Sequence, residues 1–243
     1  MSPPRFYCPC DLVSGQQLAL PEMAAHHASR VLRLQPGDAV TLFNGAGGQF
    51  PASVSTIDRH GVIVLTGESQ AIECESPLTI ILAQALSTGE KMDFTLQKAV
   101  ELGAVEIQPL ASNRSVVRLS GERAQKRVEH WQNIVVAACE QCGRNRVPLV
   151  RPVMPLLTWF SEKQGSGLRL MMSPAAAISL RDLPRPDGPI TLLAGPEGGL
   201  TDAEIAAAQG RGFTSVRFGA RILRTETAAL AGLSAIQTLW GDF

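Results

Sequence analysis

One glycine-rich stretch of the sequence has the composition of a ligand-binding loop. The apolar residues Leu192–Ala194 run directly into Gly195–Gly199 (GPEGG). Thr201–Glu204 then begins a helix with capping-box spacing. Glycines let the backbone approach a ligand closely, and open α/β sheets bind ligands beyond the carboxyl ends of their strands. An ordinary strand-to-helix turn does not need three glycines, a proline and a central glutamate, so we predict a ligand loop here.

A second stretch, Phe218–Ala228 (FGARILRTETA), places two arginines and a carboxylate at the start of the last predicted helix. Glu226 falls in the first helical turn, where the helix dipole favours a negative charge. In one interpretation, Glu226 complements the helix and Arg224 pairs with it. In the other, Arg221 and Arg224 flank the apolar pair Ile222-Leu223 and suit a cofactor with an apolar ring and charged ends. The spacing leaves both interpretations open.

A third stretch, Glu140–Pro148 (EQCGRNRVP), has Arg144 and Arg146 in a short loop after Gly143. Paired arginines in a loop are good phosphate ligands, but arginines also complement the C-terminal end of a helix dipole. The surrounding residues 114–151 contain eight basic and three acidic residues. This local excess suits a phosphate backbone, and a solvated helix face is the alternative.

Two other motifs are better explained by structure than by chemistry. Cys139 and Cys142 form a C-x-x-C near the end of a predicted helix, where the dipole does not favour a thiolate, and no histidine lies near them. We therefore predict that Cys139 is a core residue and that the chain binds no metal. The glycine run 44–48 leads into a strand-like stretch instead of a helix, so we predict a hairpin turn and no dinucleotide site.

Length and composition are those of a soluble chain with one large domain or two modest ones. The 243 residues carry 22 basic and 22 acidic side chains, so the net charge does not indicate a partner. No apolar run approaches the ~20 residues that span a bilayer, and the N-terminus lacks the order of a secretory signal. We therefore expect a cytoplasmic protein without a membrane partner.

The elements that must position these motifs fall into two groups. In the first group, a compact β-barrel with one helix at about 22–34 is predicted from four short strands, Gln17–Leu20, Ala39–Phe43, Phe50–Ile57 and Gly61–Thr66. The polar segment 69–77 is a plausible linker. The second group alternates strands (Leu78–Leu86, Val105–Leu110, Leu168–Met172, Ile190–Ala194, Val216–Phe218) with helices (Glu90–Leu102, Gly121–Cys142, Thr225–Trp240). Such alternation predicts an α/β fold whose mostly parallel sheet is covered on both faces. The last helix is apolar nearly all round, which indicates burial in a core or an interface.

At the three stretches LLAGPEGGL, FGARILRTETA and CEQCGRNRVP the sequence resembles the ribosomal RNA small-subunit methyltransferase E family of the SPOUT superfamily. The stretches Gly89–Gly103 and His26–Asp38 resemble it as well, so the likeness spans nearly the whole chain. The resemblance implies a PUA-like β-barrel that binds RNA over residues 1–72. It also implies a SPOUT methyltransferase domain over residues 73–243, with a parallel sheet and a C-terminal trefoil knot. Members of this family are homodimers that use S-adenosylmethionine to methylate uridine N3 in 16S rRNA of the small ribosomal subunit.

The resemblance also assigns roles to individual residues. It implies ten cofactor-binding residues: Leu170, Met171, Met172, Gly195, Glu197, Gly199, Gly219, Ile222, Leu223 and Thr225. Six arginines are expected to bind RNA: Arg5, Arg30, Arg33, Arg114, Arg144 and Arg146. As a hypothesis for catalysis, Arg224 stabilises negative charge on the uracil carbonyl oxygens, while Glu226 orients it or assists proton removal.

Two other functions compete with this interpretation. One is a SPOUT-type transferase that acts on tRNA or on another rRNA base. The other is a non-catalytic RNA-binding protein of the same fold, which the intact glycine loop and RTET segment disfavour. A nucleotide-dependent oxidoreductase is weaker still, because no strand is followed by G-x-G-x-x-G and a helix.

Overall fold

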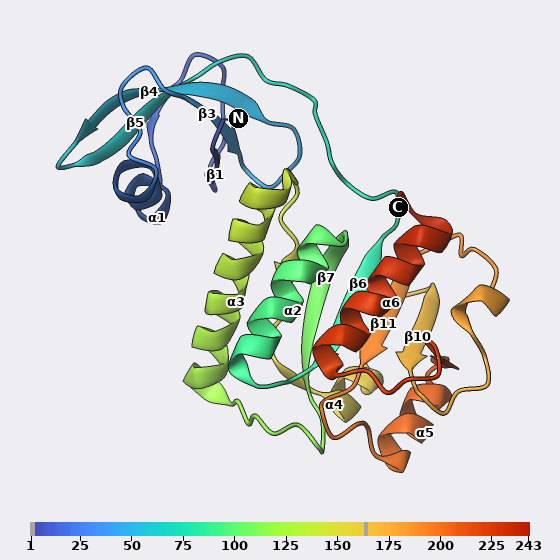
Figure 1. The fold of residues 1–243 in the computed structure, drawn as a ribbon. Helices are drawn as coiled ribbons and strands as arrows, with labels where there is room; N and C mark the ends of the chain where they lie inside the picture. Colours follow the sequence, from blue (N-terminus) through green and yellow to red (C-terminus); the bar gives the residue numbers. More distant parts are fainter. Residues whose placement is uncertain (1–2, 163–164) are drawn as a thin grey trace. The chain divides into compact units, whose positions relative to one another are not determined.

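The computed structural model of the protein describes residues 3–162 and 165–243. The chain folds into two compact units, one of Met1–Glu75 with Cys139–Val147 and the other of Ser76–Ala138 with Pro148–Phe243 (Figure 1). The domain boundary expected after residue 72 lies close to the first division. The segment 139–147, which the sequence assigns to the second domain, folds with the first unit. Among the described residues, no helix is both long and apolar enough to cross a membrane.

The first unit is built on a sheet with the strand order β1-β3-β4-β5-β2. Its strands are β1 (Arg5–Tyr7), β2 (Gln17–Ala19), β3 (Ala39–Phe43), β4 (Phe50–Asp58) and β5 (Gly61–Thr66). The predicted strands agree with β2 to β5. The sequence did not predict β1, because it has three residues and pairs in parallel with β3, far along the chain. Phe6, Leu42 and Val64 are fully buried at the centre of the core of this unit.

The predicted helix of the first unit is divided into two parts. α1 (Glu22–His26) is an α-helix, and η1 (His27–Val31) continues it as a π-helix. The backbone of Arg33 adopts a φ of 53°, in the left-handed region, so a right-handed helix cannot continue through this residue. The helical segment therefore ends before the predicted residue 34. Ala24, Ala25 and Ala28 pack this segment against the core.

Buried polar contacts attach segment 139–147 to the rest of the first unit. Arg144 donates to Glu75, with 2.6 Å between Nη2 and Oε2, and the side chains of the two residues are 4% and 16% exposed. Arg5 donates through Nη2 to Asn145 Oδ1 at 2.5 Å, and the Asn145 amide donates to Ile72 O at 2.6 Å. The arginines of this segment thus help to assemble the first unit.

Two cysteine thiols of the first unit, Cys8 and Cys139, are buried. Cys139 is fully buried, as predicted, and packs near Arg146, whose carbonyl oxygen is 3.7 Å from its Sγ. Burial raises the pKa of the Cys8 and Cys139 thiols to about 12, so both stay neutral at physiological pH. No group of three or more metal-ligating side chains occurs in the part of the chain that the structure describes.

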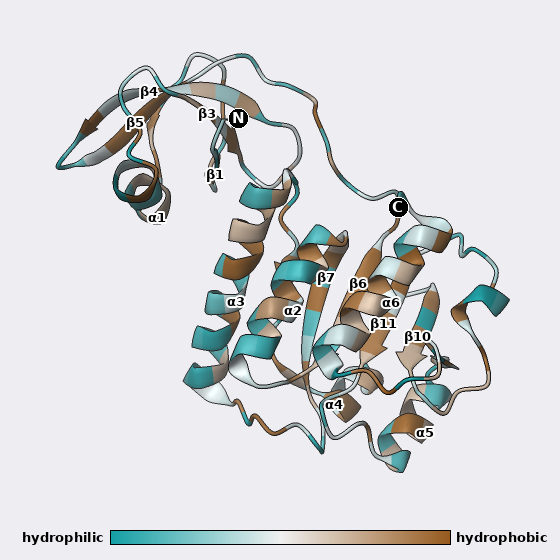
Figure 2. Cartoon of the chain, in the orientation of Figure 1, coloured by the Kyte–Doolittle hydropathy of each residue, from teal (hydrophilic) through white to brown (hydrophobic). Residues whose placement is uncertain are grey.

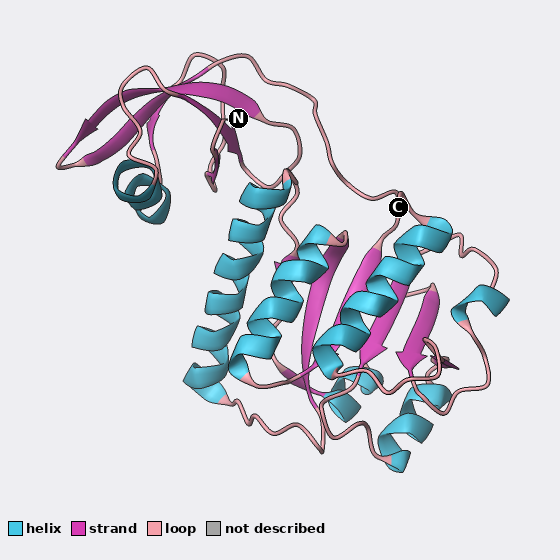
Figure 3. Cartoon of the chain, in the orientation of Figure 1, coloured by secondary structure: helices cyan, strands magenta, loops and turns pink. Residues whose placement is uncertain are grey.

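The second unit contains a parallel sheet with the order β12-β10-β11-β6-β7-β8, and β9 also pairs with β7 (Figure 3). Its strands are β6 (Ile80–Ala85), β7 (Ala104–Ala111), β8 (Leu149–Val150), β9 (Met154–Pro155), β10 (Leu168–Met172), β11 (Ile190–Ala194) and β12 (Thr214–Val216). Its helices are α2 (Gly89–Glu101), α3 (Gly121–Cys142, whose last turn belongs to the first unit), α4 (Leu156–Ser161), α5 (Asp202–Gly210), α6 (Thr225–Trp240) and the short 3₁₀-helix η2 (Leu180–Asp182). The predicted α/β fold with a parallel sheet is confirmed. The last strand ends two residues earlier than predicted, because its pairing with Leu170–Met172 of β10 fixes it at 214–216.

Alternating residues of the central strands bury both faces of this sheet. Leu193 and Met171 pack with the α4 aromatics Trp159 and Phe160 on one face. On the other face, Gly232 of α6 lies against Leu192 and Met172, and a Cβ atom at this glycine would come within 2.8 Å of Leu192 Cδ2. The strands are accordingly apolar along most of their length (Figure 2). The sequence did not predict α4, whose single turn and a half is too short to show a periodic pattern.

The ion pair between Arg144 and Glu75 gives a stability prediction. We expect Glu75→Gln to destabilise the first unit by about 3 kcal/mol, because it leaves a buried guanidinium without its counter-charge. Glu106→Gln is the matched control. It breaks the pair between Arg151 and Glu106, which is just as short at 2.7 Å, but the Arg151 side chain is 46% exposed. We expect that change to cost less than about 1 kcal/mol.

Hydrogen exchange of the β3–β5 amides for Glu75→Gln and of the β6 and β7 amides for Glu106→Gln, together with urea unfolding, measures the loss of stability in the unit that each change affects. Equal losses of stability in the two variants would mean that burial does not set the strength of the Arg144–Glu75 pair.

Candidate functional site

A pocket of about 610 Å³ lies in the second unit, where three loops follow three neighbouring parallel strands. Residues 173–174 follow β10, Gly195–Leu200 follows β11, and Phe218–Arg224 follows β12. Because parallel strands end at a common edge of the sheet, their carboxyl ends bring these loops together. The volume is within the range of pockets that enclose a cofactor-sized ligand.

A buried chain of hydrogen bonds fixes the base of the pocket. Thr225 Oγ1 donates to the carbonyl oxygen of Gly195 at 2.6 Å and accepts from Gln84 Nε2 at 3.2 Å. Gln84 lies on β6 and is fully buried, and Thr225 is the first residue of α6. These two hydrogen bonds connect the residue after β11 to both β6 and the first residue of α6. They fix the position of Gly195, where the glycine loop begins, relative to the sheet.

The first turn of α2 also contributes to the pocket. Lys91 lines it, and its Nζ lies 3.4 Å from Oε1 of Glu197 in the glycine loop. The backbone N–H of Thr88 donates to the same oxygen at 3.4 Å. Partial burial raises the pKa of the Glu197 carboxyl, but hydrogen bonds from the backbone N–H groups of Glu197 and Thr88 and from Lys91 outweigh burial and lower it overall. Glu197 is therefore a carboxylate at neutral pH.

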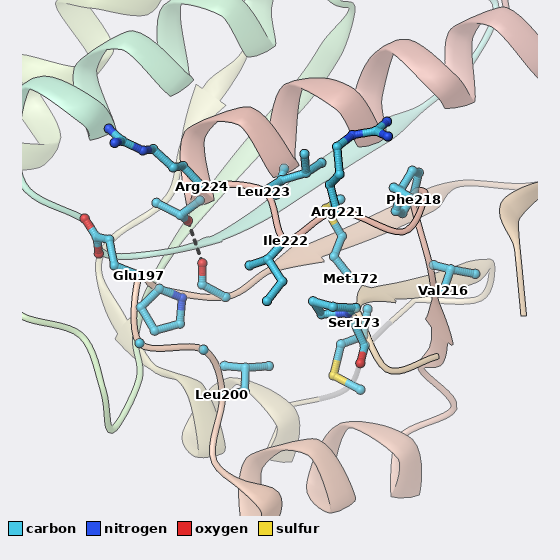
Figure 4. A pocket seen from close by; sticks show the side chains of 18 of the residues that line it. Met172, Ser173, Glu197, Leu200, Val216, Phe218, Arg221, Ile222, Leu223 and Arg224 are labelled. Atoms are coloured by element: carbon cyan, nitrogen blue, oxygen red, sulfur yellow. Dashed lines mark hydrogen bonds between the residues drawn. The ribbon is translucent and has the colours of Figure 1, made fainter. Parts of the chain in front are cut away.

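Charged and apolar groups both line the pocket. Glu197 and Arg224 lie together on one side of the close-up view (Figure 4). Met172, Val216 and Phe218 lie on the other side, where a second arginine, Arg221, lies beside Phe218, and Ile222 projects between the two sides. The glycine loop leaves its backbone accessible, and the φ of +70° at Gly199 is one that residues with a side chain rarely adopt. The site can therefore hold a molecule with a flat apolar part and a charged part.

Most of the residues predicted to bind the cofactor meet in this pocket. Nine line it: Met171, Met172, Gly195, Glu197, Gly199, Gly219, Ile222, Leu223 and Thr225. The tenth, Leu170, does not. It is fully buried, because it lies two residues before the end of β10, inside the sheet.

Sequence reasoning did not single out some of the lining residues. Lys91, Ile205 and Ala228 belong to helices that border the pocket. Lys91 lies in the stretch GEKMDFTLQKAVELG, just after a buried strand. Ligands bind beyond the carboxyl ends of such strands, so this position could have indicated a pocket residue. Ile205 and Ala228 gave no signal, since an apolar residue in a helix usually indicates a core position.

The two predicted catalytic residues lie in different surroundings. Arg224 lines the pocket and is exposed. Glu226 is absent from the pocket lining, and its Oε2 is buried without a hydrogen-bond partner among the described residues. No ion pair joins these two side chains in the described structure. The predicted pairing of Glu226 with Arg224 is therefore not what positions Arg224.

The six arginines predicted to bind RNA also differ in their surroundings. Arg30, Arg33 and Arg146 are exposed side chains of the first unit. In the same unit, Arg5 is half-buried, donates a hydrogen bond to Asn145, and has its Cζ 5.0 Å from the centre of the Phe43 ring. Arg144 is buried and forms an ion pair with Glu75. These contacts give the last two arginines a structural role. The sixth, Arg114, is exposed in the second unit and donates to the glycine loop.

Comparison with known proteins agrees with this architecture. The family described as RNA methyltransferase domain matches residues 74–237, and the RNA methyltransferase PUA domain matches residues 20–66. Ribosomal RNA small subunit methyltransferase E of Buchnera aphidicola subsp. Schizaphis graminum is 35% identical over 98% of this chain and 97% of its own length. The chain belongs to the ribosomal RNA small subunit methyltransferase E family. The member of this family from Bacillus subtilis is 33% identical over 87% of this chain and 86% of its own length.

Solved structures extend the likeness to the whole fold. The small subunit methyltransferase E of Neisseria gonorrhoeae, solved bound to S-adenosylmethionine, is 44% identical with a TM-score of 0.93, and the match covers 100% of both chains. A methyltransferase of Legionella pneumophila, solved with the same cofactor, is 40% identical with a TM-score of 0.96 and the same coverage. The RNA methyltransferase and PUA domains of the family correspond to the second and first units seen here.

Proposed function

We propose that this protein transfers a methyl group from S-adenosylmethionine to N3 of a uridine in 16S rRNA of the small ribosomal subunit. One observation carries the proposal. Three loops and the first turn of α2 converge on one pocket that places an arginine beside a glycine-lined cofactor site. Membership of the methyltransferase E family and the bound cofactor of the Neisseria gonorrhoeae relative support it. The substrate is made in the cytoplasm, where we expect the enzyme to act.

The residues that line the pocket fit S-adenosylmethionine. The apolar group of Met172, Val216 and Phe218 suits the flat adenine ring, and the Gly195–Gly199 backbone suits the polar ribose edge. Glu197 offers a carboxylate to the positive charge of the ligand. We therefore assign cofactor binding to the nine predicted residues that line the pocket, with Lys91 and Phe218 added.

When bound, the cofactor supplies an electrophilic methyl group, and uracil N3 forms a bond to it as the carbon–sulfur bond breaks and its electron pair passes to sulfur. The N3 proton must leave in this reaction, so negative charge develops on the uracil ring and its two carbonyl oxygens. Arg224 carries a fixed positive charge at the pocket and stabilises this developing charge. The packed loops hold the reacting groups in line, which is a large share of catalysis for an already activated methyl donor.

Glu226 is assigned no proton transfer in this mechanism. A base must lie within hydrogen-bond reach of the proton it removes, and Glu226 does not line the pocket. Its place in the first turn of α6 agrees with the other predicted role, in which its charge complements the helix dipole. The proton leaves to solvent or through a group of the bound RNA.

We further propose that the first unit binds RNA and that the enzyme works as a homodimer with a C-terminal trefoil knot. Arg30, Arg33 and Arg146 are exposed and able to meet phosphates, whereas Arg5 and Arg144 are engaged within the unit. Exposed apolar side chains on and after α6, Leu239 and Phe243, support an interface between copies. The meeting of the 195–200 and 218–224 loops in one pocket supports the knot.

Labelled methyl transfer tests the reaction itself. Small ribosomal subunits from a strain that lacks this gene are incubated with the protein and radiolabelled S-adenosylmethionine, and the RNA is digested to nucleosides. We expect label in N3-methyluridine at one site. Label in another nucleoside, or in deproteinised tRNA only, would overturn the assigned substrate. Absence of both label and cofactor binding would leave a non-catalytic RNA-binding protein.

The role of Arg224 gives a kinetic prediction. We expect Arg224→Ala to lower kcat by about 100-fold, the usual cost of losing one group that stabilises an oxyanion. The Kd for S-adenosylmethionine, measured by calorimetry, should change much less. Arg217→Ala is the control, because Arg217 is an exposed arginine of the same segment that does not line the pocket. Unchanged turnover of Arg224→Ala with bound cofactor would refute the assignment.

The exposed arginines of the first unit give a binding prediction. We expect the double variant Arg30→Gln/Arg33→Gln to weaken binding to small-subunit RNA. It should also reduce the slope of log K against log salt by about 1 for each phosphate that the protein no longer neutralises. Filter binding between 50 and 200 mM salt, roughly the range over which such contacts lose affinity, measures both effects. Cofactor binding should be unaffected. An unchanged salt slope would exclude both arginines as phosphate ligands.

A further inference from the structure

The buried carboxylate of Glu204 accepts a hydrogen bond from a segment outside the helix that it caps. Glu204 is 1% exposed in the first turn of α5, and its Oε2 accepts from the backbone N–H of Thr201 at 2.8 Å and from the Thr201 hydroxyl at 2.9 Å. A capping box needs no more than these bonds and the return bond from Glu204 N to Thr201 Oγ1. The second oxygen, Oε1, instead accepts from the backbone N–H of Asn113 at 2.8 Å. Asn113 lies in the loop that follows β7.

The next residue of that loop contacts the glycine loop directly. Arg114 Nη1 donates to the carbonyl oxygen of Gly198 at 3.1 Å and lies 3.5 Å from that of Leu200. Its stem packs on the glycine, since a Cβ atom placed at Gly198 would come within 3.2 Å of Arg114 Cβ. A side chain at position 198 would therefore press on this contact.

The loop that makes these contacts is a tight turn whose two ends are buried, although Asn113 and Arg114 at its centre are exposed. The backbone N–H of Ser115 donates to Ser112 O at 3.1 Å, and the hydroxyls of the two serines lie 2.8 Å apart. Both serines are buried. The turn is thus a rigid support rather than a flexible arm.

We propose that Glu204 and Arg114 are positioning residues that hold the glycine loop in the shape that binds S-adenosylmethionine. Neither side chain lines the pocket. Together they attach the turn after β7 to the segment 198–204, while Thr225 holds the other end of the glycine loop at Gly195. Arg114 thereby acts on the cofactor loop rather than on RNA phosphate. The inference rests on the proposed function, because it takes this loop to bind the cofactor.

Calorimetric titration with S-adenosylmethionine, in the absence of RNA, tests the role of Glu204. Glu204→Gln keeps the size of the side chain but turns an amide NH₂ toward one of the two backbone donors. We expect the Kd to rise about tenfold, the effect of losing a hydrogen bond to a charged group. Asp202→Asn is the matched control, since it removes the same charge from the same helical turn at an exposed position, and its Kd should match that of the wild type.

A purely structural role of Glu204 would lower the melting temperature of Glu204→Gln without changing the Kd of the folded protein. Titrations are therefore run where circular dichroism shows the variant to be folded. In turnover assays, the KM for the cofactor should rise while kcat at saturation stays near that of the wild type, which is the signature of weakened binding rather than impaired chemistry.

Arg114→Met separates loop positioning from RNA binding. It keeps the stem over Gly198 and removes the donor, so we expect a weaker Kd for the cofactor with no RNA present. Arg123→Met is its control, because Arg123 is an exposed arginine in the first turn of α3 that does not line the pocket, and its Kd should match that of the wild type. A Kd unchanged in both Glu204→Gln and Arg114→Met overturns the inference while leaving the proposed function intact. Failure of the wild type to bind the cofactor overturns both.

Discussion

Parallel pairing places the carboxyl ends of β12, β10, β11 and β6 at one edge of the sheet, and the rest of the site depends on this arrangement. The central strands β11 and β6 are mostly apolar and buried on both faces, so their register cannot slip without moving core side chains into the wrong layer. Because the strands are fixed, the points at which the following loops begin are fixed as well. Segments far apart in the chain, such as Lys91 and Arg224, meet at one pocket because the strands beneath them are locked together.

Close packing of α6 against β11 places the start of α6 beside the pocket. α6 can lie against β11 because Gly232 has no side chain at the contact with Leu192. The start of the same helix then sits near enough for Thr225 to bind the carbonyl oxygen of Gly195. The glycine loop has few side chains of its own with which to pack, so its shape depends on polar contacts from α6, where Gln84 of β6 supports Thr225, and from the turn after β7. A loop built in this way presents backbone groups to a ligand without having to fold around it.

Arginine shows how burial decides the role of one residue type. Arg144 and Arg146 are two residues apart in the same short loop, yet one is 4% exposed in an ion pair with Glu75 and the other is 59% exposed. The first contributes to assembling the first unit from two distant parts of the chain, and the second faces solvent with a looser ion pair to Glu73 at 3.7 Å. Arg114 is a third case, because its donors are turned toward carbonyl oxygens of the glycine loop. Long cationic side chains serve as structural donors or as ligands according to what the fold places beside them.

The sequence alone determined the elements and the loops of the site. The range of α3 follows from hydrophobic periodicity, and those of α6, β10 and β11 follow from continuous apolar stretches. LLAGPEGGL and FGARILRTETA marked two of the three pocket loops, because glycines and charges after apolar runs are local signals. Tertiary structure decided what depends on distant neighbours. It assigned residues 139–147 to the first unit, buried Leu170 inside the sheet, excluded Glu226 from the pocket and added Lys91 to it. None of these follows from spacing, because burial and hydrogen-bond partners are set by segments that the chain brings together only when it folds.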